Sequence, residues 1–166
     1  MAHVLSNPPS FIERKPCRFL IMDAPTDTNL PAYLAEMKRY GVHTVVRACE
    51  PSYSTEPLKR EGVDVREMAF DDGSPPPPEV IEDFMSLVRD EFGAHGKEER
   101  AIAVHCVAGL GRAPVLVAIA LIELCNMDPF DAVALIRSKR RGAINARQLD
   151  WIERYKPASQ GCCLIC

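Results

Sequence analysis

The sequence lacks a long hydrophobic run, and it carries no large excess of charge of either sign. Its longest apolar stretch, residues 113–122, is about half as long as a membrane-spanning helix needs. The formal net charge of −3 and the isoelectric point near 5.8 argue against nucleic acid as the main partner. The first residues show no basic start followed by an apolar segment, so we expect no secretory signal.

Cysteine is present in an odd number, seven, and in no pattern typical of a disulfide framework or a zinc site. Three of the seven lie at the extreme C-terminus, and the others are widely spread. We therefore expect a reducing, cytosolic environment, no metal and no cofactor. With 166 residues, 47% of them hydrophobic, the chain is long enough for one domain with a sizeable core.

Proline is abundant, with 14 residues, and four of them follow one another at 75–78. Because proline interrupts helices and central strands, this composition favours short elements separated by firm turns. Hydrophobic periodicity predicts strands and helices that alternate along the chain. The strands are expected at 18–22, 42–47, 63–68 and 101–104, and the helices at 30–40, 55–61, 79–92, 113–125, 129–139 and 146–155.

This alternation predicts an α/β fold, in which helices flank a central, mostly parallel sheet. We expect residues 18–157 to form the folded domain. The polar, proline-bearing stretch 1–17 is predicted to be a flexible arm, and residues 158–166 a flexible tail.

The segment 105–112 (HCVAGLGR) lies between an apolar strand and a buried helix. Backbone N–H groups and the helix dipole converge on an anion at such a junction, and Gly109 and Gly111 allow the loop to curve inward. Cys106 would lie at the floor of this positive cup, which favours a thiolate nucleophile. Arg112 can bind two oxygens of a phosphoryl group with its planar side chain. The alternative is a buried structural cysteine followed by a surface arginine, but the flanking strand, glycines and helix favour a phosphate site.

Transfer of a phosphoryl group from an alcohol or phenol also needs an acid that protonates the leaving oxygen. Asp71 and Asp72 lie on the proline-braced loop after the third expected strand, which would hold a carboxylic acid in place. Two adjacent carboxylates are commonly a turn signal or a helix N-cap. We expect one of the pair to be the general acid, and the residues alone do not separate the two.

The string HCVAGLGR is the signature of cysteine-dependent protein phosphatases. Together with FDDG before the prolines, AP after the arginine, KRRGA and the C-terminal cysteine box, it resembles the phosphatase of regenerating liver (PRL) family. The resemblance extends from about residue 19 to residue 155 and resumes at the terminus. It implies a protein tyrosine phosphatase-like fold of dual-specificity size, and hydrolysis of phosphotyrosine or other phosphoprotein monoesters through a phosphocysteine intermediate.

The resemblance also implies roles for single residues. Cys106 would be the nucleophile, Arg112 the phosphate clamp and Asp72, rather than Asp71, the general acid. The rest of the phosphate loop would contact the substrate through Val107, Ala108, Gly109, Leu110 and Gly111.

Ala113 departs from the common pattern, because most such phosphatases carry Ser or Thr after the clamp arginine. That hydroxyl assists the thiolate as it leaves phosphocysteine, so its absence predicts a fast first half-reaction, a slow second one and accumulating phosphoenzyme. The loop residues Val107, Ala108 and Leu110 are apolar. They favour a flat aromatic ligand, and hence phosphotyrosine over phosphoinositide.

Two further residues are expected beside the nucleophile. Cys49 follows the expected strand 42–47, and a family cysteine at this place forms a reversible disulfide with the nucleophile, here Cys106. The alternative is that Cys49 is a small buried hydrophobe. His105 is expected to point away from the substrate and to brace the loop through hydrogen bonds.

The last four residues, CLIC, fit a C-a-a-X prenylation box. Cys163 would carry the isoprenoid, and Cys162 is a candidate for palmitoylation, which matters because one lipid alone gives only reversible membrane binding. Residues 156–161 hold one lysine, whereas family members usually carry a polybasic stretch there, so electrostatic help should be weak. We expect the cytoplasmic side of the plasma membrane and endosomal membranes, and a soluble cytosolic fraction of unlipidated chain.

Arg140 and Arg141, after the expected helix 129–139, are most simply a solvated basic end. In the family the matching KRRGA segment contacts protein partners, notably cyclin-M magnesium transporters, so Arg141 is a candidate partner-binding residue. The alternative to an enzyme is therefore a regulatory module that docks on such a transporter and uses phosphocysteine as a switch. Relatives also form trimers, which makes a homotrimer a further expectation. Sulfur transfer by a rhodanese-like loop fits poorly, because FDDG would have no role.

Overall fold

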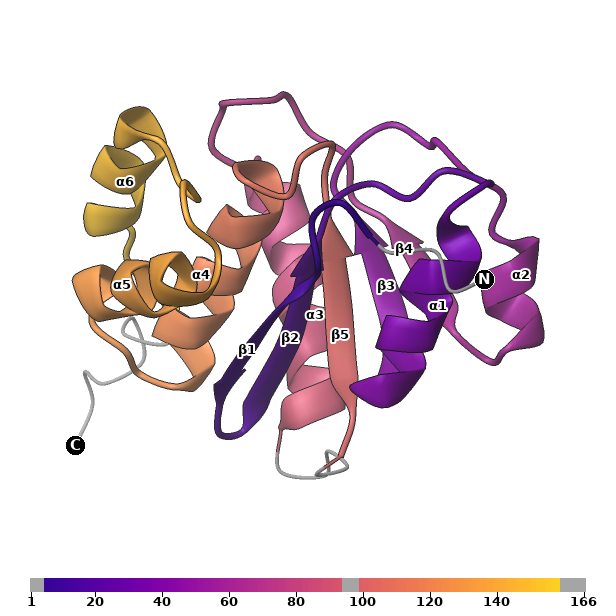
Figure 1. The fold of residues 1–166 in the computed structure, drawn as a ribbon. Coiled ribbons are helices and arrows are strands. Elements are labelled where there is room, and N and C mark those ends of the chain that lie inside the picture. The colour runs from indigo at the N-terminus through magenta and orange to yellow at the C-terminus, as the bar shows by residue number, and fades with distance from the viewer. Residues whose placement is uncertain (1–4, 94–98, 159–166) are drawn as a thin grey trace.

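The computed structural model describes residues 5–93 and 99–158. Five strands form one sheet in the order β1-β2-β5-β3-β4 (Figure 1). The first two strands pair antiparallel, and all the other pairs are parallel. The strands are β1 (Ser10–Arg14), β2 (Cys17–Met22), β3 (Val42–Arg47), β4 (Asp64–Glu67) and β5 (Ala101–His105).

Helices cover both faces of this sheet, as the alternating pattern predicts, and Figure 1 shows the two layers. One apolar cluster packs α1 (Leu30–Arg39) and α2 (Glu56–Arg60) against one face. A larger cluster packs the remaining helices against the other face. These are α3 (Pro78–Phe92), α4 (Arg112–Leu124), α5 (Pro129–Lys139) and α6 (Ala146–Glu153). The predicted α/β fold is therefore confirmed. Within 5–93 and 99–158, no helix has both the length and the apolar composition that a membrane crossing requires.

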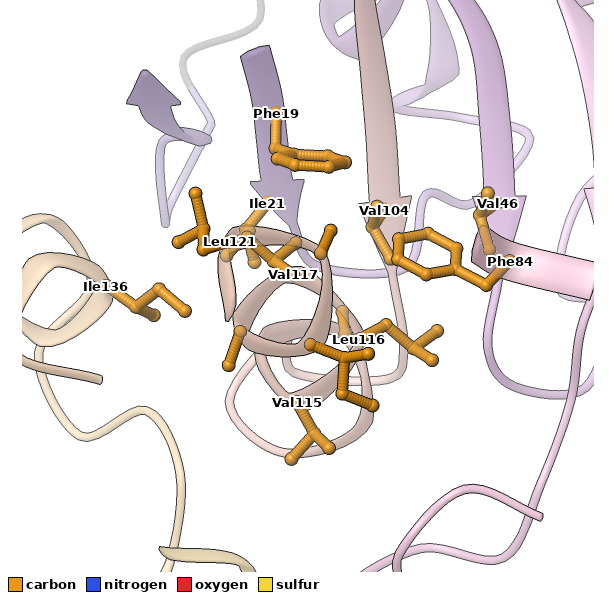
Figure 2. Close-up of a cluster of buried hydrophobic side chains, with 14 of the residues drawn as sticks. Phe19, Ile21, Val46, Phe84, Val104, Val115, Leu116, Val117, Leu121 and Ile136 are labelled. Carbon is orange, nitrogen blue, oxygen red and sulfur yellow. The ribbon is translucent and has the colours of Figure 1, made fainter. Parts of the chain in front are cut away.

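The centre of the larger cluster is α4, whose residues from Ala113 to Leu121 are fully buried. Figure 2 shows its side chains between those of the sheet and those of α3 and α5. Burial of each large apolar side chain contributes about 1.5–3 kcal/mol. A helix that is apolar on most sides is held by contacts all round, so the N-terminus of α4 and the loop before it are fixed in place.

The stretch predicted to be a flexible arm, residues 1–17, contains a strand, and that prediction was wrong over β1. Residues 10–14 pair with β2 along their whole length, and Ile12 is fully buried against the core. Pro8, Pro9 and Pro16 bracket this strand. Proline is tolerated beside an edge strand, where no neighbouring strand needs its N–H, so its presence does not exclude a strand between the turns.

The carboxyl ends of the parallel strands meet at one edge of the sheet. His105, the last residue of β5, pairs with Met22 on one side and with Arg47 on the other. The segments that follow β2, β3 and β5 therefore leave the sheet side by side. Ligands of α/β sheets bind beyond this edge, and the segment 105–112 lies there.

Candidate active site

The two ends of the loop between β5 and α4 are bound to neighbouring backbone. The carbonyl oxygen of Val107 accepts a hydrogen bond from the N–H of Ala24 at 2.9 Å. The carbonyl oxygen of Leu110 accepts one from the N–H of Ile144 at 2.7 Å. Segments far apart in the sequence thus hold the loop from outside.

A buried arginine holds the middle of the same loop. Arg140 is 4% exposed, and it donates from Nε to the carbonyl oxygen of Gly109 at 2.7 Å and from Nη2 to that of Ala108 at 3.1 Å. Its charge is balanced by an ion pair with Asp23. The expectation of a solvated basic end was therefore wrong for Arg140, whereas Arg141 is exposed.

These bonds determine where the N–H groups of the loop point. Four successive carbonyl oxygens, from 107 to 110, bond outward, and in a trans peptide the following N–H points the opposite way. The N–H groups of residues 108–111 therefore face the inner side of the loop. Across 5–93 and 99–158, none of them donates to a protein acceptor. Together with the N-terminus of α4, they form a ring of donors suited to an anion.

Gly109 is required for this curvature. Its φ of +62° lies in the left-handed region that side chains rarely adopt. A Cβ atom there would also lie 2.6 Å from Arg140 Nη2 and 2.6 Å from the carbonyl oxygen of Met22. No other residue type fits at this position without moving the loop.

Cys106 directly precedes the residues of this ring and is buried. The preceding residue, His105, is fully buried, and burial lowers its pKa to about 4, so the ring is neutral. Tyr53 contacts Nε2 with its hydroxyl at 2.9 Å, while Nδ1 lies 3.3 Å from the carbonyl oxygen of Cys106. One neutral tautomer satisfies both contacts, with Tyr53 donating to Nε2 and Nδ1–H donating to the carbonyl. The expected bracing role of His105 is confirmed.

Cys49 is buried on the same side of the sheet edge. Its Sγ lies 3.9 Å from His105 Nδ1. Burial raises the pKa of the Cys49 thiol, and the nearby Cys106 raises it further. The positive charge of Arg112 lowers the same pKa, but the net shift is upward. Cys49 and Cys106 are both free thiols. The structure therefore places the two expected redox partners near each other without a bond between them.

Arg112 joins the phosphate loop to the loop that carries the two aspartates. Its Nη1 donates to the carbonyl oxygen of Phe70 at 3.1 Å, and its Nε lies 3.5 Å from Asp72 Oδ1. The Asp72 side chain is 78% exposed, so it reaches the arginine from the solvent side. The structure thus brings together two expected site residues, Arg112 and Asp72, at the end of the loop that the buried Cys106 begins.

Gln148 is a site residue that sequence reasoning missed. It is 1% exposed, and its Oε1 accepts from the N–H of Asn145 at 3.0 Å, as part of a capping box at the start of α6. Its Nε2 has no acceptor in the part of the chain that the structure describes. A Cβ atom at Gly111 would lie 3.2 Å from that Nε2 and 3.6 Å from Asp72 Oδ1. The amide therefore borders the ring of donors.

The Nε of Arg112 is the other buried side-chain donor that makes no hydrogen bond within the described ranges, although the Asp72 carboxylate lies 3.5 Å from it. Buried donors are almost always satisfied, because an unpaired one is costly. Two such donors beside the same ring of N–H groups indicate a site that binds an anion. No group of three or more His, Cys, Asp or Glu within 5–93 and 99–158 is arranged to hold a metal ion.

The rim of the site is apolar, as the loop composition predicts. Val107 is 64% exposed and Leu110 is 38% exposed. Large apolar side chains at the surface beside a binding site provide a face on which an aromatic ring can pack.

The fold and this loop are those of the dual-specificity and tyrosine phosphatases that use a cysteine. A family model described as "Polymorphic toxin system, DSP-PTPase phosphatase" matches residues 22–126. A solved structure of a protein tyrosine phosphatase from Leishmania major superposes with a TM-score of 0.79 at 44% identity, over 89% of this chain and 98% of that chain.

Curated relatives narrow this class to one family. The chain is 49% identical to protein tyrosine phosphatase type IVA 3 of Homo sapiens, over 95% of this chain and 89% of that protein. It is also 49% identical to PRL-1 phosphatase of Drosophila melanogaster, over 92% of this chain and 85% of that protein. The chain belongs to the type IVA, or PRL, family of protein tyrosine phosphatases, and the resemblance drawn from its motifs is confirmed.

Proposed function

We propose that this phosphatase hydrolyses phosphotyrosine in proteins through a phosphocysteine on Cys106, and that the second of its two steps is slow. The observation that carries the proposal is the ring of inward N–H groups at residues 108–111, which follows directly after the buried Cys106. Such donors stabilise the negative charge that spreads over the equatorial oxygens during transfer.

In the first step the Cys106 thiolate attacks phosphorus, so that an S–P bond forms as the P–O bond to the tyrosine oxygen breaks. Arg112 and the loop N–H groups hold the three other oxygens. Asp72, in its protonated form, donates its proton to the leaving phenolate. The contact between Asp72 and Arg112 supports this role, because it keeps the carboxyl group beside the site.

In the second step water attacks phosphocysteine, Asp72 accepts the proton of the water, and the thiolate leaves with the electrons of the S–P bond. A hydroxyl at the first position after Arg112 would hydrogen-bond to the departing sulfur. Ala113 is buried there and has no hydroxyl. The thiolate therefore leaves without that assistance, which supports a slow second step.

Replacing Ala113 with serine should raise the steady-state rate about tenfold, because one hydrogen bond to a developing thiolate lowers the barrier by about 1–2 kcal/mol. A stopped-flow trace with an aryl phosphate should show a burst in the unchanged protein and a smaller burst in the variant. Ala118→Ser, at another buried alanine of α4, is the matched control and should leave the rate unchanged. Equal rates in the two phases of the unchanged protein would contradict the slow second step.

The apolar rim supports an aromatic substrate. Val107 and Leu110 offer exposed apolar surface on which a tyrosine ring can pack, and neither residue offers a charge for a second phosphate. This favours phosphotyrosine over a phosphoinositide headgroup.

We further propose that peroxide links Cys49 to Cys106. The Cys106 thiolate attacks peroxide to give a sulfenic acid, and the Cys49 thiol then displaces hydroxide from that sulfur, which leaves a disulfide and water. The burial of Cys49 beside His105 supports this link, because it places a second thiol behind the nucleophile.

We also propose a lipid anchor at the C-terminus, with an isoprenoid on Cys163 and an acyl chain on Cys162. Both cysteines lie outside the described residues, so the proposal rests on the CLIC sequence alone. Cys163→Ser should move the protein from the membrane pellet to the supernatant of fractionated cells, since one acyl chain gives only marginal binding. Cys125→Ser, outside the box, should leave the distribution unchanged, and a membrane-bound Cys163→Ser variant would contradict the anchor.

A docking role beside catalysis is supported by the position of Arg141. It is exposed and lies between Arg140 and Ile144, which both bond to the phosphate loop. A partner such as a cyclin-M-type magnesium transporter could therefore contact Arg141 and cover the site. Arg141→Glu should weaken binding of that transporter at least about tenfold by charge reversal, whereas Asp72→Asn should abolish turnover and retain binding. Unchanged binding by Arg141→Glu would contradict this role.

A further inference from the structure

A second pair of thiols lies at the edge of the sheet opposite the phosphate loop. Cys17 is the first residue of β2, and Cys125 follows the last residue of α4. The other ends of these two elements, Met22 and Arg112, border the active site. The full lengths of β2 and α4 therefore separate this pair of thiols from Cys106.

The two cysteines meet at the same turn of the β1–β2 hairpin. The Sγ of Cys125 donates to the carbonyl oxygen of Arg14 at 3.2 Å, and Arg14 is the residue paired with Cys17 across the hairpin. The interaction with the Cys17 side chain lowers the pKa of Cys125 to about 7, and the interaction with Cys125, together with burial, raises the pKa of Cys17.

We propose that Cys17 and Cys125 form a reversible disulfide when the protein meets hydrogen peroxide, independently of the cysteines at the active site. Cys125 is the partly exposed member, so peroxide reaches it first. Its sulfur attacks the peroxide oxygen and becomes a sulfenic acid as hydroxide leaves. The Cys17 sulfur then attacks that sulfur and water departs, so that two thiols are oxidised and one peroxide is reduced to two waters. A thiol reductant reverses the step.

The contacts of Cys17 support the second half of this reaction. Cys17 is fully buried, so peroxide itself has little access to it, while the Cys125 sulfur bonds to the backbone of the residue that pairs with Cys17. A resolving thiol beside an accessible one captures the sulfenic acid before further oxidation.

The disulfide would join the C-terminal end of α4 to the β1–β2 hairpin. It would close a long loop, from residue 17 to residue 125, and a cross-link of that span restricts the unfolded chain strongly. We expect the melting temperature to rise by about 5 °C or more on oxidation. The Cys106 sulfur takes no part in this link. The rise in melting temperature on oxidation should therefore also occur in a variant that lacks Cys106.

The experiment uses the full-length chain with its other five cysteines replaced by serine: Cys49, Cys106, Cys162, Cys163 and Cys166. After brief exposure to hydrogen peroxide, the intact mass should fall by two hydrogens in the monomer. A non-reducing peptide map should contain a peptide that links Cys17 to Cys125, and a thiol reductant should restore the mass. The matched control adds Cys125→Ser to the same background and should keep Cys17 as a thiol.

Sulfinic or sulfonic acid on Cys125, a disulfide between two molecules, or two unchanged thiols would each overturn the proposal. If the background variant fails to fold, the same map is made on the unchanged protein after alkylation of the remaining thiols. There a Cys17–Cys125 peptide supports the pair, and its absence overturns it. This map reports the Cys49–Cys106 link separately, so failure of one pair is distinguishable from failure of the other.

Discussion

Replacing Cys106 with serine should lower the rate of aryl phosphate hydrolysis at least about 10⁴-fold, because the nucleophile of a covalent mechanism is removed. Serine is close in size to cysteine, but its hydroxyl is not ionised near neutral pH. Both ring nitrogens of His105 are engaged, Nε2 by the Tyr53 hydroxyl and Nδ1 by the carbonyl oxygen of Cys106, so His105 offers no base for that hydroxyl. The ring of N–H groups remains, and we therefore expect binding of inorganic phosphate to be retained.

Steady-state rates with an aryl phosphate measure this effect, and phosphate binding by calorimetry reports the site itself. Cys17→Ser is the matched control, since it also changes a buried cysteine but lies at the opposite edge of the sheet. It should keep the rate within about twofold, because its Sγ touches no part of the phosphate loop. A Cys106→Ser variant that retains a tenth or more of the activity would contradict the assignment of the nucleophile.

Arg112→Lys should lower kcat/KM about 10³-fold, although the positive charge is retained. Lysine lacks the planar pair of donors that binds two oxygens at once. Arg112 bonds to the carbonyl oxygen of Phe70 with Nη1 while its Nε faces Asp72. The single ammonium group of lysine cannot make both contacts at once. In the proposed mechanism the substitution therefore removes the clamp and loosens the loop that carries the proposed general acid, and these two losses act on the same transition state.

The matched control is Arg154→Lys, in an exposed ion pair with Asp150 on α6. Exposed pairs contribute little, so this variant should keep both the activity and the melting temperature. The melting temperature of Arg112→Lys separates a loss of clamping from a loss of folding. An Arg112→Lys variant with near-normal kcat/KM would show that charge alone suffices at this position.

The sequence was sufficient to predict the fold and to locate the candidate site in one segment, because both depend on local patterns. The apolar strand, the two glycines and the apolar helix around HCVAGLGR lie within one short segment, and their periodicities are distinct. The segment Ser10–Arg14 was misjudged for an equally local reason. Prolines on both sides indicate turns, and they obscure a five-residue alternation that becomes a strand only when β2 is beside it.

Arg140 and Gln148 could not be predicted, because their partners are far away in the sequence. Arg140 in KRRGA looks like part of a solvated run, yet it bonds to Gly109, about 30 residues earlier. Gln148 gives a local signal, a capping box with Asn145, which predicts the start of a helix. The capping box does not indicate that the side-chain Nε2 of Gln148 lies beside Gly111. Such contacts follow from how α5 and α6 pack on α4.

The central claim is that the loop after β5 binds a phosphoryl group and transfers it to Cys106. The most direct test is the intact mass of the protein after brief exposure to an aryl phosphate and rapid acid quenching. The unchanged protein should gain the mass of one phosphoryl group, because Ala113 leaves the second step unassisted, and the adduct should map to Cys106. Turnover without any adduct on the protein, or the same adduct on Cys106→Ser, would contradict the account.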